Sequence, residues 1–459
     1  MTDTRLEQDS LGRIAVPADA LYGAQTQRAL ENFDIAGRPL PPAFIHALAR
    51  IKRAAALVNA ELGVLDPEIA VAIGNAATEV IGGQHDEQFP VDVFQTGSGT
   101  STNMNVNEVL AHLASAASGL SVHPNDHVNA GQSSNDIIPT TLQLSAALSL
   151  QAELQPALEQ LAQLIATRAA LFGDVVKTGR THLMDAMPIR LDQEMSGWRQ
   201  QIVNAGERLG DTLRRLCELP LGGTAVGTGV NAHPRFSAAV VKRLADETQL
   251  PLVPGRNFFE RLSSVDTALE LSGQLRVLAA AILKISNDLR WMNSGPNSGL
   301  GEIQLAALQP GSSIMPGKVN PVIPEACAMA CAQCLGLDAA IAIAGQSGNF
   351  QLNVMLPLVA DNLLTMLTVL ARTCRALGGH GGIGDFQVNR AYLAEQAARN
   401  PILATALAPL IGYQRAAEIV KTANAENRPL LDVAQSMTDL DAATLQHLLD
   451  IQRLTGPGN

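Results

Sequence analysis

Residues 271–289 read LSGQLRVLAAAILKISNDL, and their apolar side chains recur at the spacing of an α-helix. The recurring positions are Leu271, Leu275, Leu278, Ile282, Ile285 and Leu289. An apolar stripe with a period of about 3.5 residues is typical of helices that lie side by side in a long bundle. Residues 279–281 are alanines beside this stripe, so more than one face of the helix is apolar. Such a helix needs neighbours on every side, and we expect a helical core built from several chains.

A second apolar stripe supports the same fold class. Its members recur at helical spacing and are Leu154, Leu158, Leu161 and Ile165. Pro156 interrupts this stripe and is expected to kink the helix, because proline has no N–H and its ring clashes with the preceding turn. Aromatic residues make up only 3% of the chain, which argues against a β-sandwich. We therefore expect an all-α fold with long central helices.

Glycine and proline breaks divide the chain into three expected domains. Residues 1–135 carry most of the irregular signals and form an N-terminal domain. Residues 136–356 carry both helical stripes and form a central long-helix bundle domain. Residues 357–459 show shorter helical patterns, broken by glycine pairs at Gly378 and Gly381, and form a small C-terminal helical domain.

Charge and composition exclude several functions. The chain has 32 Lys and Arg against 43 Asp and Glu, a net charge of −11, which argues against nucleic-acid binding. No apolar run reaches the length needed to cross a bilayer, so no membrane partner is expected. The start, MTDTRLEQDS, lacks the features of a secretory signal. Five cysteines do not suggest a disulfide framework, and we expect a cytoplasmic protein.

The most informative polar segment is residues 311–321, G-S-S-I-M-P-G-K-V-N-P. Two glycines and two prolines predict a hinged loop of restricted conformation. The loop gathers two hydroxyls, the Lys318 ammonium and an amide, and it runs into a helix at Pro321. Its backbone N–H groups and Lys318 are suited to holding an anion. A polar surface loop with a helix cap explains the composition equally well, so both interpretations stay open at this point.

Three further segments have a similar character: residues 96–100 (TGSGT), 133–136 (SSND) and 179–182 (GRTH). The first is a small-residue turn that can bring backbone donors to a carboxylate. The second precedes a helix, and an N-cap is the simpler interpretation when it is taken alone. The third places His182 beside a hydroxyl in a polar stretch, although a lone histidine is more often structural.

No metal or nucleophile motif competes with these segments. Cys327, Cys331 and Cys334 invite a metal interpretation, but their i, i+4, i+7 spacing favours three small apolar side chains on one helix face. His123 and His127 lie four residues apart, yet Pro124 argues against a helical zinc pair. We find no dinucleotide fingerprint, P-loop or G-x-S-x-G. No metal and no cofactor are therefore expected.

Taken together, these segments resemble one family. The eleven residues 311–321 are similar to the signature of the fumarase/aspartase superfamily, and the agreement runs from residues 16–19 to 412–413. Within the superfamily the chain resembles the class II, iron-independent fumarases. The resemblance implies a homotetramer whose central domains form a twenty-helix bundle, with each active site shared by three chains. It also implies reversible hydration of fumarate to (S)-malate, a small dicarboxylate, by anti addition and elimination through an aci-carboxylate.

The resemblance also implies roles for individual residues. Ser312 matches the base that removes the C3 proton, and His182, partnered by Glu325, matches the group that transfers a proton at the hydroxyl end. The expected substrate-binding residues are Ser98, Gly99, Thr100, Ser133, Ser134, Asn135, Thr181, Ser313, Lys318 and Asn320. A secondary anion site is implied at His123, Asn125 and Asp126.

Some positions match the family less well. Residues 322–325 and 352–355 look like aspartase, so an ammonia-lyase acting on aspartate or a related amino acid is the alternative function. Met184 stands where the family has glutamine after T-H-L, and Leu120 falls about where a basic residue of the secondary anion site is expected. A helical assembly protein without catalytic activity is a third possibility, but Ser312 and Lys318 are both present.

Overall fold

A computed structural model describes residues 3–456, and these form two compact units. The first unit contains the chain up to Pro156, together with Ala205–Ala279 and Ala330–Arg372. The second contains Ala157–Asn204, Ala280–Met329 and the chain from Thr373 onward. The chain passes between the units inside long helices, so a single helix contributes residues to both. The three-domain division expected from the sequence stays a prediction.

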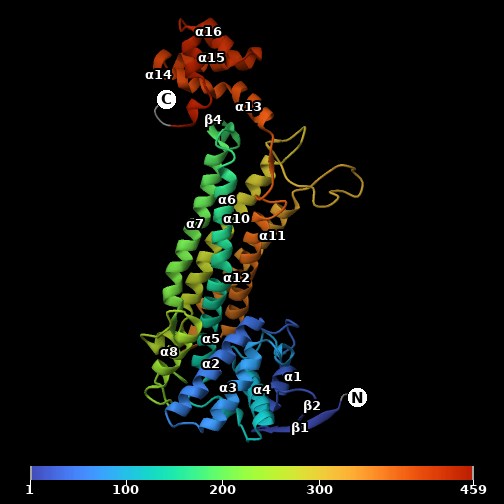
Figure 1. Ribbon diagram of the computed structural model, residues 1–459, viewed down its shortest axis with the longest axis vertical. Helices are drawn as coiled ribbons and strands as arrows, with labels where there is room; N and C mark the ends of the chain where they lie inside the picture. The colour runs from blue at the N-terminus through green and yellow to red at the C-terminus, as the bar shows by residue number, and fades with distance from the viewer. Residues whose placement is uncertain (1–2, 457–459) are drawn as a thin grey trace. The chain divides into compact units, whose positions relative to one another are not determined.

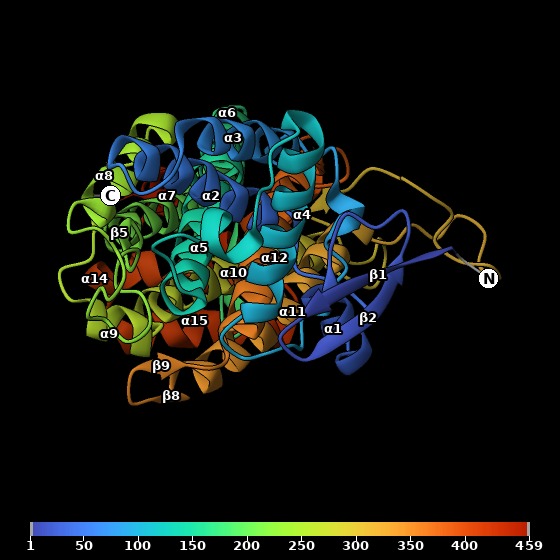
Figure 2. The same ribbon diagram turned by 90° about the horizontal axis from the view of Figure 1, so that it is seen from below.

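The first unit begins with a hairpin and a group of helices (Figures 1 and 2). Strands β1 (Thr4–Asp9) and β2 (Gly12–Pro17) pair antiparallel. The helices that follow are α1 (Ala24–Asn32), α2 (Pro42–Glu61), α3 (Pro67–Ile81), α4 (Thr100–Ser118), α5 (Ser134–Ser149) and α8 (Phe236–Thr248). Helix α2 buries Phe44, Leu48 and Ile51 on one face, as its apolar spacing requires. Short η turns lie at Asp86–Gln88 and Pro124–Val128.

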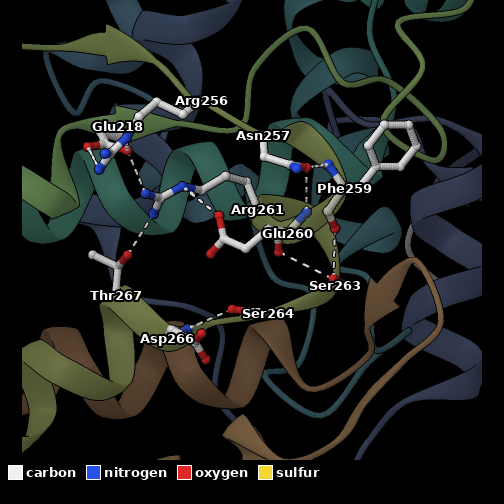
Figure 3. Close-up of polar contacts among 10 residues, drawn as sticks. All are labelled: Glu218, Arg256, Asn257, Phe259, Glu260, Arg261, Ser263, Ser264, Asp266 and Thr267. Carbon is white, nitrogen blue, oxygen red and sulfur yellow. Dashed lines mark hydrogen bonds and ion pairs between the residues drawn. The ribbon is translucent and has the colours of Figure 1, made fainter.

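Short strands and one short helix complete the first unit. Strands β5 (Glu218–Leu219) and β6 (Val253–Pro254) run parallel, and β8 (Gly348–Asn349) pairs with β9 (Leu352–Asn353). Figure 3 shows how Arg261 of α9 (Phe258–Ser263) ties this region together. Its guanidinium donates to Glu218 at 2.7 Å and to Thr267 at 2.7 Å, and it lies 3.1 Å from the Glu260 carboxylate. This arginine therefore joins β5, α9 and the start of the next helix.

Five long helices dominate the central part of the chain. They are α6 (Gln155–Ala169), α7 (Leu191–Leu216), α10 (Asp266–Met292), α11 (Val322–Gly345) and α12 (Leu356–Gly378). All six members of the stripe in residues 271–289 lie on α10 and are fully buried. In the first unit, Asp338 of α11 accepts hydrogen bonds from Ser272 and Arg276 of α10. The all-α prediction is confirmed, since every sheet among the described residues has only two strands.

The helical run that contains Pro156 changes its hydrogen-bonding pattern near the proline. Helix α5 is followed directly by a π-helical turn at Leu150–Leu154, and α6 begins at Gln155. A proline in a helix removes one i→i−4 hydrogen bond, and here the π-helical turn ends two residues before Pro156.

The second unit carries two small two-stranded sheets and a cluster of short helices. Strand β3 (Val176–Thr181) pairs with β4 (Met184–Arg190), and β7 (Ile303–Gln304) pairs with β10 (Gln387–Val388). The short helices are α13 (Arg390–Arg399), α14 (Ala408–Ile411), α15 (Tyr413–Glu426), α16 (Leu430–Met437) and α17 (Ala442–Leu448), with 3₁₀ turns at Pro401–Leu407 and Arg453–Thr455. Figure 1 shows α14, α15 and α16 packed together. Their apolar core includes Leu403, Ile419 and Val433.

Helix α11 corrects one sequence prediction. Among the described residues it is long and apolar enough to cross a membrane by length and composition, with a mean hydropathy of 1.7. The expectation that no apolar run reaches this length is therefore wrong for residues 322–345. Glu325, Gln333 and Asp338 break the helix into shorter runs of apolar residues, although its mean hydropathy stays high. Only 28% of its most apolar window is buried, and Met329 and Ile343 are 68% and 61% exposed.

Candidate active site

In the first unit, residues 96–100 form the turn that opens α4. Gly99 is the N-cap, with φ at +73°, a conformation that favours glycine. Ser98 Oγ and Thr100 Oγ1 lie 2.8 Å apart and share a hydrogen bond. A side chain at Gly97 would collide with the backbone of Val354, and a Cβ at Gly99 would come within 2.8 Å of Ile138. The glycines therefore let this turn pack closely against two neighbouring segments.

The segment 133–136 opens α5, and the N-cap interpretation is confirmed for Ser133. Its hydroxyl accepts the N–H of Asn135 at 3.2 Å, and Asp136 Oδ1 accepts the N–H of Ser133 at 2.9 Å. This reciprocal pair is a capping box. Asp136 is fully buried, and its other oxygen accepts the N–H groups of Gly222 and Thr224. Burial raises the pKa of Asp136, although these N–H bonds and nearby Lys52 oppose the shift.

The structure brings these two helix N-termini together. Asn103, in the first turn of α4, donates from Nδ2 to Ser134 Oγ at 3.0 Å. Asn135 Nδ2 donates to the carbonyl of Ala225 at 2.8 Å, which holds the α5 turn against the glycine-containing segment after β5. Helix N-termini carry partial positive charge and unpaired N–H groups. Two of them side by side, lined with hydroxyls, are suited to an anionic ligand.

In the second unit, Thr181 and His182 lie at the tip of the β3–β4 hairpin. Thr181 pairs with Met184, which leaves His182 and Leu183 as the two turn residues. Both have positive φ, +55° and +61°, as a type I′ hairpin turn requires. Such turns normally use asparagine or glycine, so histidine and leucine here are strained. The His182 side chain is exposed and has no hydrogen-bond partner within residues 3–456, so it is not a buried structural histidine.

The signature loop, residues 311–321, folds around Ser312. The half-buried Ser312 Oγ accepts the N–H of Ile314 at 3.2 Å and that of Met315 at 3.1 Å. Hydrogen bonds donated to an oxygen favour its negatively charged form, and both bonds therefore favour ionisation of this hydroxyl. Ser313 is exposed beside it. Residues 307–312 and 315–319 line a cavity of about 400 Å³.

Internal hydrogen bonds close the base of this loop. Gly311 N–H donates to the carbonyl of Lys318 at 3.0 Å, and Asn320 Nδ2 donates to the carbonyl of Gly311 at 2.7 Å. Lys318 Nζ donates to Asn320 Oδ1 at 2.8 Å. A side chain at Gly311 would collide with the Lys318 carbonyl, so only glycine fits there. Residues 313–319 are nevertheless exposed, and Ile314 is 83% exposed. The loop is therefore closed at its base and open at its tip.

A buried ion-pair cluster lies beside the hairpin in the second unit. Lys177 of β3 is 2% exposed, and its Nζ lies 2.6 Å from both Glu194 and Glu302. Arg180, the residue before Thr181, donates to Glu302 Oε1 at 2.6 Å. Glu302 immediately precedes β7, where the chain leads toward the signature loop. The cluster therefore joins the hairpin of His182 to the start of the signature segment.

Glu325 lies in the first turn of α11 and is half-buried. Within residues 3–456 its carboxylate makes no hydrogen bond to His182, the partner that the resemblance implies. The pairing of these two residues therefore stays a prediction.

The residues of the expected secondary anion site lie in the first unit. His123 accepts the N–H of Asp126 at 3.1 Å, and its ring also lies 3.2 Å from the Asp126 carboxylate. His123 and Asn125 line a cavity of about 900 Å³, whereas Leu120 lies on a different cavity. The guanidinium of Arg5, also on the larger cavity, donates to Glu7 and to backbone carbonyls, Ala18 among them. Its charge is therefore already paired with Glu7, and its N–H groups are already hydrogen-bonded.

The three clustered cysteines point to packing. Cys327, Cys331 and Cys334 lie on α11 and are buried, with at most 2% exposure. Burial raises the pKa of Cys327 and Cys334 to about 11, so both remain thiols at neutral pH. Within the described part of the chain, no group of three His, Cys, Asp or Glu is arranged to hold a metal ion.

Sequence reasoning missed several polar residues behind the site. They are Lys52, Asn103, Asn129 and Gln132 in the first unit, and Lys177, Arg180 and Glu302 in the second. One signal was available: asparagines at 103, 105 and 107 are unusual in an otherwise apolar helix. The buried lysine and the ion-pair cluster had no such signal, because their partners are distant in sequence.

Two known protein families match the chain. Residues 12–336 match the family described as Lyase, and residues 403–456 match Fumarase C C-terminus. A protein named Fumarate hydratase class II 2 from Pseudomonas aeruginosa is 58% identical, with 100% of both chains covered. A Fumarate hydratase class II from Xylella fastidiosa is 55% identical over 99% of this chain and 96% of its own.

Solved structures agree with these relatives. A recombinant class II fumarase from Schistosoma mansoni superimposes with a TM-score of 0.97 at 38% identity, covering 100% of both chains. A fumarate lyase:delta crystallin from Brucella melitensis, bound to cobalt, gives a TM-score of 0.95 at 42% identity, covering 99% of this chain and 100% of its own.

The family match over residues 12–336, together with the helical fold, places this protein in the lyase class. The chain belongs to the class II fumarate hydratase family, as its full-length relatives at 55–58% identity show. This confirms the resemblance found in the sequence, and it supports the hydratase interpretation over the ammonia-lyase alternative.

Proposed function

We propose that this protein catalyses the reversible hydration of fumarate to (S)-malate. Membership of the class II fumarate hydratase family supports the reaction. The observation that carries the chemistry is the environment of Ser312, whose Oγ accepts two backbone N–H groups in the signature loop. A serine hydroxyl is a poor base in water, and such donors favour the alkoxide that proton removal requires.

Charge stabilisation is the main demand of this reaction. Removing the C3 proton of malate produces an aci-carboxylate, which places two negative charges at one end of the substrate. Preorganised cations and donors stabilise such an intermediate. Lys318, Asn320 and Thr181 supply an ammonium, an amide and a hydroxyl for this purpose. Ser98, Thr100 and the α5 turn, residues 133–135, bind the substrate carboxylates at the paired helix N-termini.

Proton transfer completes the reaction on the opposite side of the substrate. Ser312 removes the C3 proton, and His182, oriented by Glu325, protonates the departing hydroxyl as water leaves. This arrangement gives anti elimination, and the reverse steps hydrate fumarate. Closure of the exposed loop tip over the substrate would exclude water and strengthen these interactions. The strained turn that holds His182 supports a functional role for this residue.

Assembly into a homotetramer, with each site shared by three chains, is part of the proposal. Helix α11 supports it, because Met329 and Ile343 expose apolar surface along a helix that is mostly uncovered in the single chain. His182 and Glu325, which do not contact each other within the chain, would then find partners across subunits. Sedimentation should give four times the chain mass of 48.3 kDa. A monomer with full activity would refute the shared site.

The proposal extends to the location of the protein, its domains and the secondary anion site. The chain has only five cysteines, all of them buried, which supports a reducing, cytoplasmic location. The three segments 1–135, 136–356 and 357–459 are proposed as the functional domains, with the signature loop in the second. We assign no role in turnover to His123, Asn125 and Asp126, because the cationic arginine on their cavity is already hydrogen-bonded.

A direct assay tests the function. The purified protein is incubated with (S)-malate, and fumarate is followed by its ultraviolet absorbance; a parallel sample with aspartate is assayed for ammonia. We expect fumarate from malate and no ammonia above background. Faster turnover of aspartate would establish the ammonia-lyase alternative. No turnover of either substrate, beside an active control enzyme, would favour an assembly protein without catalytic activity.

A further inference from the structure

A continuous set of hydrogen bonds runs from a buried lysine to the N-terminus of α5. It begins at Lys52 of α2, which is fully buried, and passes through Asn129 and Asn103 to Ser134. All four residues belong to the first unit. The proposed reaction uses only Ser134, and the other three are polar groups behind it, of which Lys52 and Asn103 are buried.

Lys52 decides how the neighbouring amides are oriented. Its Nζ lies 2.9 Å from Asn129 Oδ1 and 3.0 Å from Gln132 Oε1. A lysine ammonium only donates, so both amide oxygens must face it. The other ends agree with this orientation. Asn129 Nδ2 donates to the carbonyl of Gln132, and Gln132 Nε2 donates to the carbonyls of Val128 and Ala130.

The orientation of Asn129 in turn decides that of Asn103. Asn129 Oδ1 lies 3.2 Å from Asn103 Nδ2 and 3.3 Å from Asn107 Nδ2. An amide oxygen only accepts, so the Nδ2 group of each asparagine must face it. Asn103 Nδ2 has a second hydrogen, which points at Ser134 Oγ, 3.0 Å away. Ser134 Oγ is therefore an acceptor in this contact.

A serine hydroxyl has one hydrogen, and this contact leaves that hydrogen free. We propose that Asn103 is a positioning residue that directs the Ser134 hydroxyl proton toward a carboxylate of the substrate. The proposal rests on the proposed function, because it takes the half-exposed Ser134 as part of the dicarboxylate pocket. Donation by Asn103 makes Ser134 a dedicated hydrogen-bond donor, and a donor suits an anionic ligand.

We call the hydrogen bonds from Lys52 through Asn129 and Asn103 to Ser134 the relay. The orientation of its amide groups does not depend on the charge of Lys52. Burial lowers the pKa of Lys52 to about 7, while nearby Asp136 opposes the shift. A neutral amine still has two hydrogens, one for each amide oxygen. The direction of donation along Lys52, Asn129 and Asn103 is therefore the same in both protonation states.

Asn103→Asp tests the relay, because it keeps the size of the side chain and replaces the donor with an acceptor. Ser134 would then donate to the introduced carboxylate rather than to substrate. We expect the KM for malate to rise by at least about tenfold, with a smaller change in kcat. Asn105→Asp is the matched control. Asn105 lies on the same helix, is equally buried at 1%, and donates instead to the carbonyl of Gln88 at 3.0 Å. Its KM should stay within about twofold of the unmodified protein.

A double-mutant cycle separates the relay from simple charge repulsion. Ser134→Ala removes the hydroxyl, so adding Asn103→Asp to it should raise KM by less than about threefold. A rise as large as in the unmodified background would show that repulsion of the substrate carries the effect, and the relay would be wrong. An unchanged KM in Asn103→Asp alone would also overturn it.

Two further measurements keep the test decisive. Should Asn103→Asp fail to fold, as judged by circular dichroism, Asn103→Ala removes the same donor without adding charge. Asn103→Ala should raise KM several fold in the unmodified protein and leave KM nearly unchanged in the Ser134→Ala background. An unchanged KM in Asn103→Ala alone would refute the relay. If the unmodified protein hydrates no fumarate, the proposed function fails. If it is active while the cycle shows no coupling, only the relay fails.

Discussion

Arg180 donates to Glu302 at 2.6 Å, and this ion pair connects the hairpin of His182 to the segment that enters the signature loop. Glu302 is 1% exposed, and Lys177 shares the same carboxylate. Removing one member of a buried pair leaves the other charge uncompensated, which is strongly unfavourable. Two segments of the candidate active site in the second unit are therefore held in register by one buried carboxylate.

Glu302→Gln is predicted to lower both stability and turnover. The substitution leaves the buried Lys177 and the half-buried Arg180 facing a neutral amide, at a cost of about 3 kcal/mol. We expect a lower midpoint in thermal unfolding and a kcat reduced by about tenfold or more, because a small misplacement of reacting groups is costly. Glu194→Gln is the control, since Glu194 also pairs with Lys177 but is more exposed and does not contact Arg180. Equal losses of kcat in both variants would contradict this role.

Ser312→Ala is predicted to remove the proposed base while leaving the fold and assembly intact. Ser312 is only half-buried and bonds only within its own loop, so its loss disturbs little packing. We expect kcat for malate dehydration to fall by at least about a hundredfold, with an unchanged sedimentation profile. Ser313→Ala, in the adjacent exposed position, should mainly raise KM. Near-normal turnover in Ser312→Ala would show that another group removes the proton.

Gly99→Ala is predicted to cost more than the same change at Gly119. Both glycines have φ of +73°, and they cap opposite ends of α4. An alanine at either place must adopt the left-handed conformation, which destabilises the protein by about 1 kcal/mol. Only at Gly99 does the new Cβ approach Ile138 at 2.8 Å, whereas at Gly119 nothing lies within 4 Å. Thermal unfolding should show the larger loss for Gly99→Ala, together with a raised KM. Equal losses would mean that packing at Gly99 is relaxed.

Lys52→Met is predicted to change how stability depends on pH. In the folded protein, burial lowers the pKa of Lys52 to about 7, against 10.5 for a free lysine. Between these values the unfolded chain binds the extra proton, so the contribution of Lys52 to stability rises as pH increases. The unmodified protein should therefore gain stability relative to Lys52→Met between pH 7 and about pH 10. Melting temperatures of both proteins at several pH values provide the comparison, and a constant difference would contradict the low pKa.

Local patterns in the sequence were enough to predict the helices. The stripe that includes Leu271 and Leu289 has helical periodicity, and every member is buried on α10. The N-cap at Ser133 was also predictable, because a capping box needs only residues three apart. The sequence reasoning missed that helix α11 is long and apolar enough to cross a membrane by length and composition, since two acidic residues hide its high average hydropathy.

Tertiary contacts explain what the sequence could not indicate. Lys52 and Asn129 are 77 residues apart in the sequence, and Arg180 and Glu302 are 122 residues apart. No local sequence pattern therefore predicts either pair. The strained turn at His182 likewise depends on strand pairing that forces positive φ on two ordinary residues.

The sequence by itself determined the helical class, the family and the segments of the candidate active site, because periodicity and an eleven-residue signature are local properties. Only the tertiary structure decided the orientation of those groups. It placed the α4 and α5 N-termini together through Asn103 and Ser134, and it aimed two N–H groups at Ser312. The physical reason is that hydrogen-bond direction and burial depend on neighbours brought together only by folding.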